Sequence, residues 1–156
     1  YFADGFAFSG EALAGKAKGA NNRQSLRETV KHLFYWGWGA SILFSLVFFF
    51  GLKPLLWIMT DNENLLSMAY EFRYWIILLP LVSGAAFIWE GIFIGVTASQ
   101  AMRNTMIIAS LGVFLASYYL TIQNFGKNAL WFSLHLFMIS RGVLMWIMSK
   151  KAVFEY

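Results

Sequence analysis

The sequence contains no cysteine, and only two of its 156 residues are proline. Without cysteine the chain cannot form a disulfide framework, a thiolate metal site or an iron–sulfur cluster, and it cannot use a thiol as a nucleophile. Charged residues are also scarce, at 13% of the chain, whereas soluble domains contain about 25%. Because a soluble fold of this size needs a polar surface, the scarcity argues against a water-soluble domain.

Apolar residues fill the chain instead. Hydrophobic types make up 59% of the residues, aromatic types make up 19%, and the mean hydropathy is +0.58. At about 20 apolar residues per membrane-spanning helix, the chain is long enough for four spans and part of a fifth. The apolar runs are continuous rather than alternating, so they favour helices over membrane strands. The sequence therefore predicts an all-α integral membrane bundle.

The predicted spans follow from these apolar runs. Complete spans are expected at residues 30–52, 70–98, 104–123 and 128–149, and residues 1–15 are expected to be the closing half of another span. The chain opens inside this half-span, without the basic segment and cleavage site of a signal peptide. We therefore expect the chain to be a fragment of a longer protein.

The connections between the spans are short. Lys53-Pro54 marks the exit of the span at 30–52, and residues 55–59 are expected to continue as a kinked or interfacial turn. Asp61-Asn62-Glu63-Asn64 predicts a short acidic loop before the next span.

Basic residues are divided unevenly between the two sides of the predicted bundle. One side carries eight of them, namely Lys16, Lys18, Arg23, Arg27, Lys31, Arg103, Lys150 and Lys151. The other side carries three, namely Lys53, Arg73 and Lys127. By the positive-inside rule, this bias predicts that the C-terminus lies in the cytoplasm. The expected location is the inner (plasma) membrane of the cell. In such a chain the net charge of +4 reflects topology and does not indicate a nucleic-acid partner.

Four charged residues lie inside the predicted spans: Asp4, Glu11, Glu90 and Arg141. A charge at the bilayer centre costs about 2.5–3.5 kcal/mol on insertion scales, so each needs a partner, a water-filled cavity or a proton. Glu90 and Arg141 fall at similar depth on different helices, which predicts a buried ion pair between them. A role in transport is the alternative for this pair.

Asp4 and Glu11 are two helical turns apart and therefore share one face of a helix. Their neighbours are mostly small, which leaves room for another helix, water or a substrate. Either the two acids face polar neighbours near the cytoplasmic mouth, or they mark a path for an ion or a proton. We expect Asp4, the deeper of the two, to face the interior of the bundle.

Three further positions are candidates for a hinge or for close packing. Pro80 lies inside a span, where it frees a backbone carbonyl and permits a bend. Gly91 and Gly95 form a small-xxx-small pattern, which allows two helices to approach closely.

The sequence contains no set of residues that resembles a catalytic or metal site. The two histidines, His32 and His135, lack partners at ligand spacing, so we expect no metal and no other cofactor. His135 is either a hydrogen-bonded packing residue or a proton relay. No nucleophile–base arrangement or phosphate loop is present, and the chain is therefore not expected to be an enzyme.

Several short blocks of the sequence resemble a known family. The first group is Asp4-Gly5-Phe6-Ala7, Glu11-Ala12-Leu13-Ala14-Gly15 and Gly19-Ala20-Asn21-Asn22. The second group is Glu90-Gly91-Ile92-Phe93-Ile94-Gly95-Val96-Thr97, Ala101-Met102-Arg103-Asn104, Gly126-Lys127-Asn128-Ala129-Leu130-Trp131 and Arg141-Gly142. The first group looks like a helix end and cytoplasmic loop of multidrug and toxic compound extrusion (MATE) transporters, and the second group resembles the DinF-like branch of that family. These blocks cover the whole chain in the expected order.

The resemblance implies a twelve-helix protein made of two six-helix bundles, of which this chain is the C-terminal part. Residues 1–15 would then close helix eight, and the four complete spans would be helices nine to twelve. The family exports organic cations and other amphipathic compounds in exchange for protons or sodium, and the resemblance favours protons here. The coupling acid of DinF-like members lies in the first helix, which this chain does not include. In the other bacterial branch the corresponding C-terminal acid aligns near Ser83, which cannot replace it.

The function expected from the resemblance is a cation-coupled antiporter, whose partners are the lipid bilayer, the N-terminal bundle and small amphipathic or cationic substrates. A non-transporting polytopic membrane subunit or assembly protein is the alternative. A small homodimeric pump is a third reading that requires a complete chain.

Overall fold

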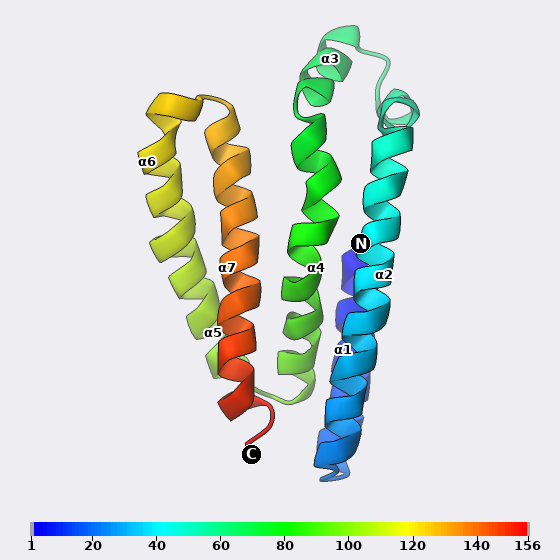
Figure 1. The fold of residues 1–156 in the computed structure, drawn as a ribbon, viewed down its shortest axis with the longest axis vertical. Helices are drawn as coiled ribbons and strands as arrows, with labels where there is room; N and C mark the ends of the chain where they lie inside the picture. The colour runs from blue at the N-terminus through cyan, green and yellow to red at the C-terminus, as the bar shows by residue number, and fades with distance from the viewer. Residues whose placement is uncertain (1, 156) are drawn as a thin grey trace.

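The computed structural model describes residues 2–155, and every regular element in that range is a helix (Figure 1). In chain order these are α1 (Phe2–Gly19), α2 (Arg23–Met59), α3 (Glu63–Glu71), α4 (Arg73–Gly95), α5 (Ser99–Ile107), the π-helix η1 (Ile108–Leu115), α6 (Ala116–Phe125) and α7 (Asn128–Ala152). Four helical stretches are long and apolar enough to cross a membrane: α2, α4, the continuous run α5–η1–α6, and α7. The prediction of an all-α membrane bundle is confirmed.

Helix α2 begins at Arg23 rather than near residue 30. Its first turn is capped by Asn22, whose Oδ1 accepts a hydrogen bond from the Ser25 N–H at 2.9 Å. Arg27, which precedes the span predicted at 30–52, therefore lies on a helix. The cap and the helix-forming residues of this stretch decide the boundary, whereas hydropathy marks only the apolar part of the helix.

The connection between α2 and α4 is more helical than the sequence analysis predicted. Helix α2 continues through Pro54 as far as Met59. Asn62 then caps α3, and its Oδ1 accepts hydrogen bonds from the N–H groups of Asn64 and Leu65 at 3.0 and 3.4 Å. Glu63 and Asn64 are thus helical rather than part of an acidic loop. The predicted stretch 70–98 is divided at Phe72 into the end of α3 and the whole of α4.

The span formed by α5, η1 and α6 is wound as a π-helix between Ile108 and Leu115. Such segments are rare and occur mostly as single turns. Nothing in the apolar composition of this stretch predicts it.

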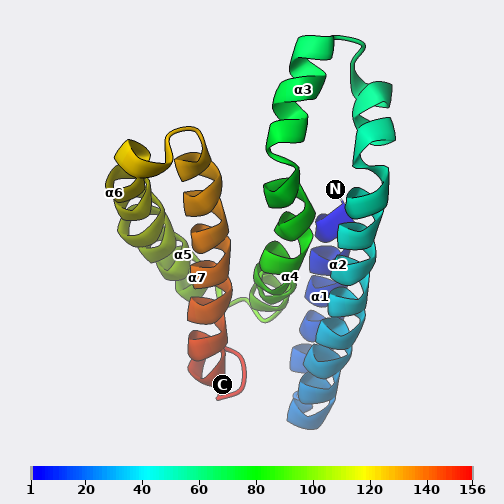
Figure 2. The same cartoon turned by 45° about the horizontal axis from the view of Figure 1, so that its top comes forward.

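Helix α4 lies at the centre of the bundle and packs against α1, α2 and α7 (Figures 1 and 2). Helices α5, η1 and α6 pack mainly against α7. The turns that follow α1 and α4 lie at the same end of the bundle as the C-terminus, and the turns that follow α2 and α6 lie at the opposite end (Figure 1). This alternation brings the basic residues that flank the turns after α1 and α4 to the same end as Lys150 and Lys151.

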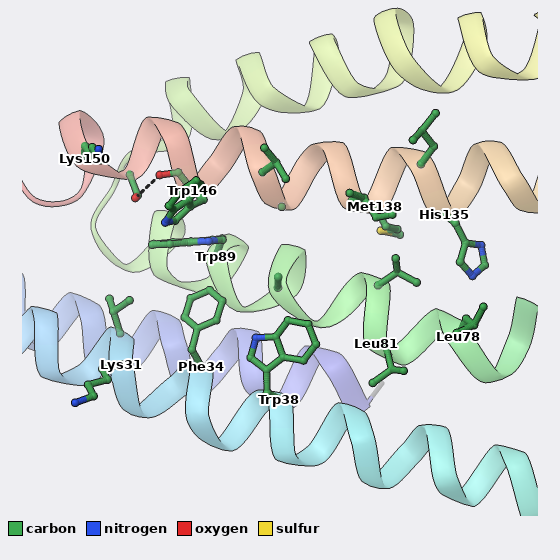
Figure 3. Close-up of a pocket in the computed structure, with 18 of the residues that line it drawn as sticks. Lys31, Phe34, Trp38, Leu78, Leu81, Trp89, His135, Met138, Trp146 and Lys150 are labelled. Atoms are coloured by element: carbon green, nitrogen blue, oxygen red, sulfur yellow. Dashed lines mark hydrogen bonds between the residues drawn. The ribbon is translucent and has the colours of Figure 1, made fainter.

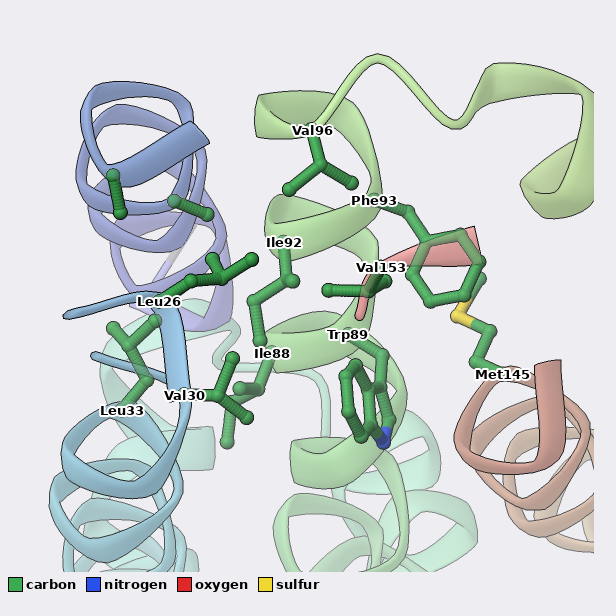
Figure 4. Packing of buried hydrophobic residues seen from close by; sticks show 12 residues of the cluster. Leu26, Val30, Leu33, Ile88, Trp89, Ile92, Phe93, Val96, Met145 and Val153 are labelled. Atoms are coloured by element: carbon green, nitrogen blue, oxygen red, sulfur yellow. The ribbon is translucent and has the colours of Figure 1, made fainter. Parts of the chain in front are cut away.

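The largest cluster of buried apolar side chains lies where α4 meets its neighbours (Figure 4). Helix α4 contributes Ile88, Trp89, Ile92 and Phe93, and the residues that pack around them include Leu26, Val30, Leu33, Met145 and Val153. Much of the remaining apolar surface points outward, with Phe50 78% exposed and Ile58 83% exposed. A bundle that exposes such side chains requires a lipid bilayer around it.

Close packing of α1 on α4 depends on two glycines. A Cβ atom added at Gly91 would clash with the backbone of Ala7, and one added at Gly95 would clash with the backbone of Glu11. Two helical backbones come this close only where one of them has no side chain. The small-xxx-small pattern in the sequence is therefore a real packing contact.

We expect Gly91→Ala to destabilise the protein by about 1–3 kcal/mol, because the new methyl group must push α1 away from α4. The measurement is thermal unfolding of the full-length protein in detergent. Gly39→Ala is the matched control, because Gly39 also lies in a helix and nothing stands within 4 Å of its added Cβ. Equal melting temperatures for the two variants would contradict the packing role of Gly91.

Candidate functional site

Glu90 and Arg141 form an ion pair between α4 and α7. Arg141 Nη2 lies 2.8 Å from Glu90 Oε2, and the two side chains are 4% and 23% exposed, respectively. The pairing expected from the sequence is thus present. Each residue supplies the opposite charge that the other needs at this depth in the bundle.

The ion pair leaves part of the Arg141 guanidinium unsatisfied. Among the described residues, neither Nε nor Nη2 of Arg141 has a hydrogen-bond partner, so the short contact to Glu90 is a charge contact without hydrogen-bond alignment. A buried ion pair with unsatisfied donors contributes little net stability, because desolvation offsets most of the Coulomb attraction. Removing either partner alone is nevertheless costly, since it leaves one buried charge unpaired.

The two acids on α1 are each half-buried. Asp4 lies in the first turn of the described helix, and Glu11 lies where α1 touches Gly95 of α4. Phe8, which lies between them about one turn from each on the same helix face, is 68% exposed. The structure therefore places Glu11 at the α1–α4 contact and Asp4 near the N-terminal end of the same helix.

Pro80 lies inside α4 and has a polar neighbour on α2. A proline cannot donate its backbone hydrogen bond, and it pushes the preceding turn of the helix apart. In that turn, the Ile77 carbonyl accepts a hydrogen bond from Ser45 Oγ at 2.6 Å. Serine side chains commonly stabilise a proline bend in membrane helices in this way.

Lys18 joins α1 to the C-terminal end of α4, a contact that was not predicted from the sequence. Its Nζ donates hydrogen bonds to the Val96 carbonyl and to Thr97 Oγ1, the latter at 3.0 Å. A cation at the C-terminal end of α4 satisfies a free carbonyl and interacts favourably with the helix dipole. In the sequence Lys18 was indistinguishable from the other basic residues of its loop.

His135 links α7 to α4, and the sequence analysis left its role open. The side chain is buried, its Nδ1 lies 2.8 Å from the Trp131 carbonyl oxygen, and its Nε2 lies 3.1 Å from the Trp75 carbonyl oxygen. The Trp75 indole packs against the imidazole with 5.0 Å between the ring centres, and its Nε1 donates a hydrogen bond to Asn128 Oδ1 at 3.0 Å. Trp75 therefore contacts two residues of α7 on the same helix face.

A groove of about 1140 Å³ lies between α2, α4 and α7 (Figure 3). Its walls are almost entirely apolar and include four tryptophans, Trp38, Trp75, Trp89 and Trp146. His135 stands toward one end of the groove, and Lys31 and Lys150 stand toward the other (Figure 3). Within residues 2–155 no three histidine, aspartate or glutamate side chains come together as metal ligands.

The comparison with known proteins identifies the family. The MatE family model matches residues 1–121. The chain belongs to the MatE family. It is also similar to the DNA damage-inducible protein F of Escherichia coli strain K12, with 31% identity over 143 residues. That alignment covers 92% of this chain and 31% of the relative, so the chain spans about a third of the relative's length.

These matches confirm the resemblance to the DinF-like branch that the sequence blocks indicated. No solved structure matches the chain. Membership of a transporter family also supports the expectation that this MatE chain is not an enzyme.

We expect Glu90→Gln to destabilise the full-length protein by about 3–5 kcal/mol, because it leaves the Arg141 guanidinium buried without a counter-charge. The double variant Glu90→Gln/Arg141→Met should recover much of that loss. Unfolding in detergent, arranged as a double-mutant cycle, measures the coupling.

The matched control is Glu71→Gln. Glu71 pairs with Lys127 at 3.7 Å, and both of these side chains are more than half exposed. Such a pair contributes at most about 1 kcal/mol. Similar losses of unfolding free energy for Glu90→Gln and Glu71→Gln would show that the buried pair contributes no more to stability than the exposed pair.

Proposed function

We propose that the protein to which this chain belongs is a secondary antiporter that exports organic cations and other amphipathic compounds. The observation that carries the proposal is the match of the MatE family model to residues 1–121. Inward movement of a cation, with protons preferred to sodium, supplies the energy. The mechanism is alternating access, in which two bundles rock around a shared cavity.

Charges held inside the helices support an ion-coupled mechanism. Acids within membrane spans mark ion or proton paths by default, because an ionised carboxylate there needs water or a donor. Asp4 and Glu11 lie half-buried on α1, and Glu90 lies half-buried on α4. Glu90 is paired with Arg141. Asp4 and Glu11 are the candidates for binding the coupled cation, because they share one face of α1 among small residues that leave room for an ion or water.

The proposed setting is the inner membrane of the cell, with the turns after α1 and α4 and the C-terminus in the cytoplasm. The support is the excess of lysine and arginine at that end of the bundle. The remaining helices of the protein, including an N-terminal bundle, are the partner against which this part moves. The aromatic walls of the groove between α2, α4 and α7 are suited to the apolar part of amphipathic molecules.

The alternative is a polytopic subunit that does not transport. Reconstitution of the full-length protein in proteoliposomes separates the two functions, because only a transporter moves a fluorescent organic cation against its gradient. An imposed proton gradient should drive this movement, and an equal sodium gradient should drive it weakly. Absence of movement under both gradients would contradict the antiporter.

We expect Asp4→Asn to abolish or strongly reduce drug efflux while the protein still reaches the membrane, because the amide cannot exchange a proton. Efflux and membrane expression are measured together. Asp61→Asn is the matched control, since Asp61 is an exposed acid in the connection between α2 and α3. Normal efflux by Asp4→Asn at normal expression would remove Asp4 from the mechanism, and lost expression would assign it a packing role.

A further inference from the structure

The two ring nitrogens of His135 face the same kind of atom. Nδ1 lies 2.8 Å from the Trp131 carbonyl oxygen and Nε2 lies 3.1 Å from the Trp75 carbonyl oxygen. A carbonyl oxygen accepts hydrogen bonds and cannot donate one. Each of these contacts is therefore a hydrogen bond only when the nitrogen concerned carries a hydrogen.

Neutral imidazole has one N–H group, whereas the protonated ring has two. In the neutral form, one nitrogen would direct a lone pair at a carbonyl oxygen, which is a repulsive contact in a buried site. We propose that His135 is a proton-binding site whose protonated ring joins α7 to α4. This inference rests on the proposed antiport, and it specifies where the C-terminal bundle responds to a proton.

The surroundings of His135 favour this assignment. The Trp75 ring lies 5.0 Å from the imidazole ring, within the range of about 6 Å at which an indole attracts a cation. The side chain also lines the groove between α2, α4 and α7 (Figure 3). The figure shows the imidazole pointing from α7 toward α4.

The charged and titratable groups on the neighbouring elements do not bond to the ring. On helices packed against α7 they are Arg73, Tyr74 and Glu90 of α4, Arg103 of α5, and Tyr118 and Tyr119 of α6. Arg73 bonds to the Tyr74 hydroxyl, and Glu90 pairs with Arg141. The hydrogen bonds of His135 therefore go to the two backbone carbonyls.

The two hydrogen bonds differ in what they connect. The Trp131 carbonyl lies one turn back on α7 itself, whereas the Trp75 carbonyl belongs to α4. When the neutral ring keeps the bond within α7, it loses the bond to α4. Trp75 lies about one and a half turns before Pro80, where α4 can bend. In that tautomer, loss of the proton removes one polar link between α7 and α4, whereas the Trp75–Asn128 bond and the Glu90–Arg141 pair remain.

A second hydrogen bond between the same helices does not depend on a proton. Trp75 Nε1 donates to Asn128 Oδ1 at 3.0 Å, near the start of α7. Asn128→Ala removes this bond and leaves His135 in place. It is the matched control for a purely structural role, because it weakens the same helix contact without changing any titrating group.

The direct test is ¹⁵N NMR of the full-length transporter with labelled histidine, in which the spectrum of His135→Asn is subtracted to assign the signals. Histidine changes charge between about pH 5 and pH 8. We expect the spectra to contain a state in which both ring nitrogens of His135 carry hydrogens, as the two carbonyl contacts require. A single neutral tautomer throughout the range would overturn the proposal.

The functional test is the pH profile of drug efflux in proteoliposomes. A rate that follows the occupancy of one proton site changes by up to about tenfold per pH unit. His135→Asn should remove most of this pH dependence, whereas Asn128→Ala and His32→Asn should keep its shape. His32 is the other histidine of the chain and is exposed on α2. An unchanged pH profile of efflux in His135→Asn would show that His135 takes no part in coupling.

The two tests separate this inference from the proposed antiport. If wild-type protein shows no proton-driven efflux but NMR shows the doubly protonated ring, the proton site stands and proton coupling is wrong. If efflux is proton-driven but the ring stays neutral, the antiport stands and the His135 site is wrong.

Discussion

The close approach of α1 to α4 at Gly91 and Gly95 is the contact on which the rest of this bundle depends. In a bilayer, burying apolar surface between helices gains little, because lipid chains are as apolar as the side chains. Stability must then come from dense packing and from polar groups that find partners within the protein. Without Cβ atoms at Gly91 and Gly95, α1 comes within backbone contact of α4. Helix α4 can then pack against α1, α2 and α7 at once.

The contact between α4 and α7 is of a different kind, because it contains polar links that respond to charge. The Glu90–Arg141 pair joins the two helices inside the bundle, and Trp75 joins them through Asn128 and His135. The groove lined by tryptophans opens between the same two helices and α2. Close backbone packing dominates the α1–α4 contact, with the Lys18 bonds at its end, whereas the packing of α4 on α7 is joined by an ion pair and hydrogen bonds inside the bundle. The second kind of contact is the one that a proton or a bound ion can change.

Much of the architecture could be predicted from the sequence. The apolar runs predicted the four spans, because the hydrophobic thickness of a bilayer fixes the length of a helix that crosses it. The pairing of Glu90 with Arg141 was also predictable, since two opposite charges at similar depth have few other partners. The helix ends were predicted less well. Capping by Asn22 and Asn62 extends α2 and starts α3 in stretches that hydropathy alone marks as loops.

The sequence by itself determined the class of this protein, its helical spans, its family and the charges that need partners. The class, the spans and these charges follow from local composition and from the cost of placing polar groups in lipid, whereas the family follows from the resemblance of short sequence blocks. Only the tertiary structure decided which groups meet. Three contacts depend on how neighbouring helices are placed. They are the bond from Lys18 to the end of α4, the bond from Ser45 to α4 near Pro80, and the contacts of His135 with two carbonyls. A single sequence carries no signal for such contacts, because backbone carbonyls are present at every residue and only the packing of helices brings one of them to a particular side chain.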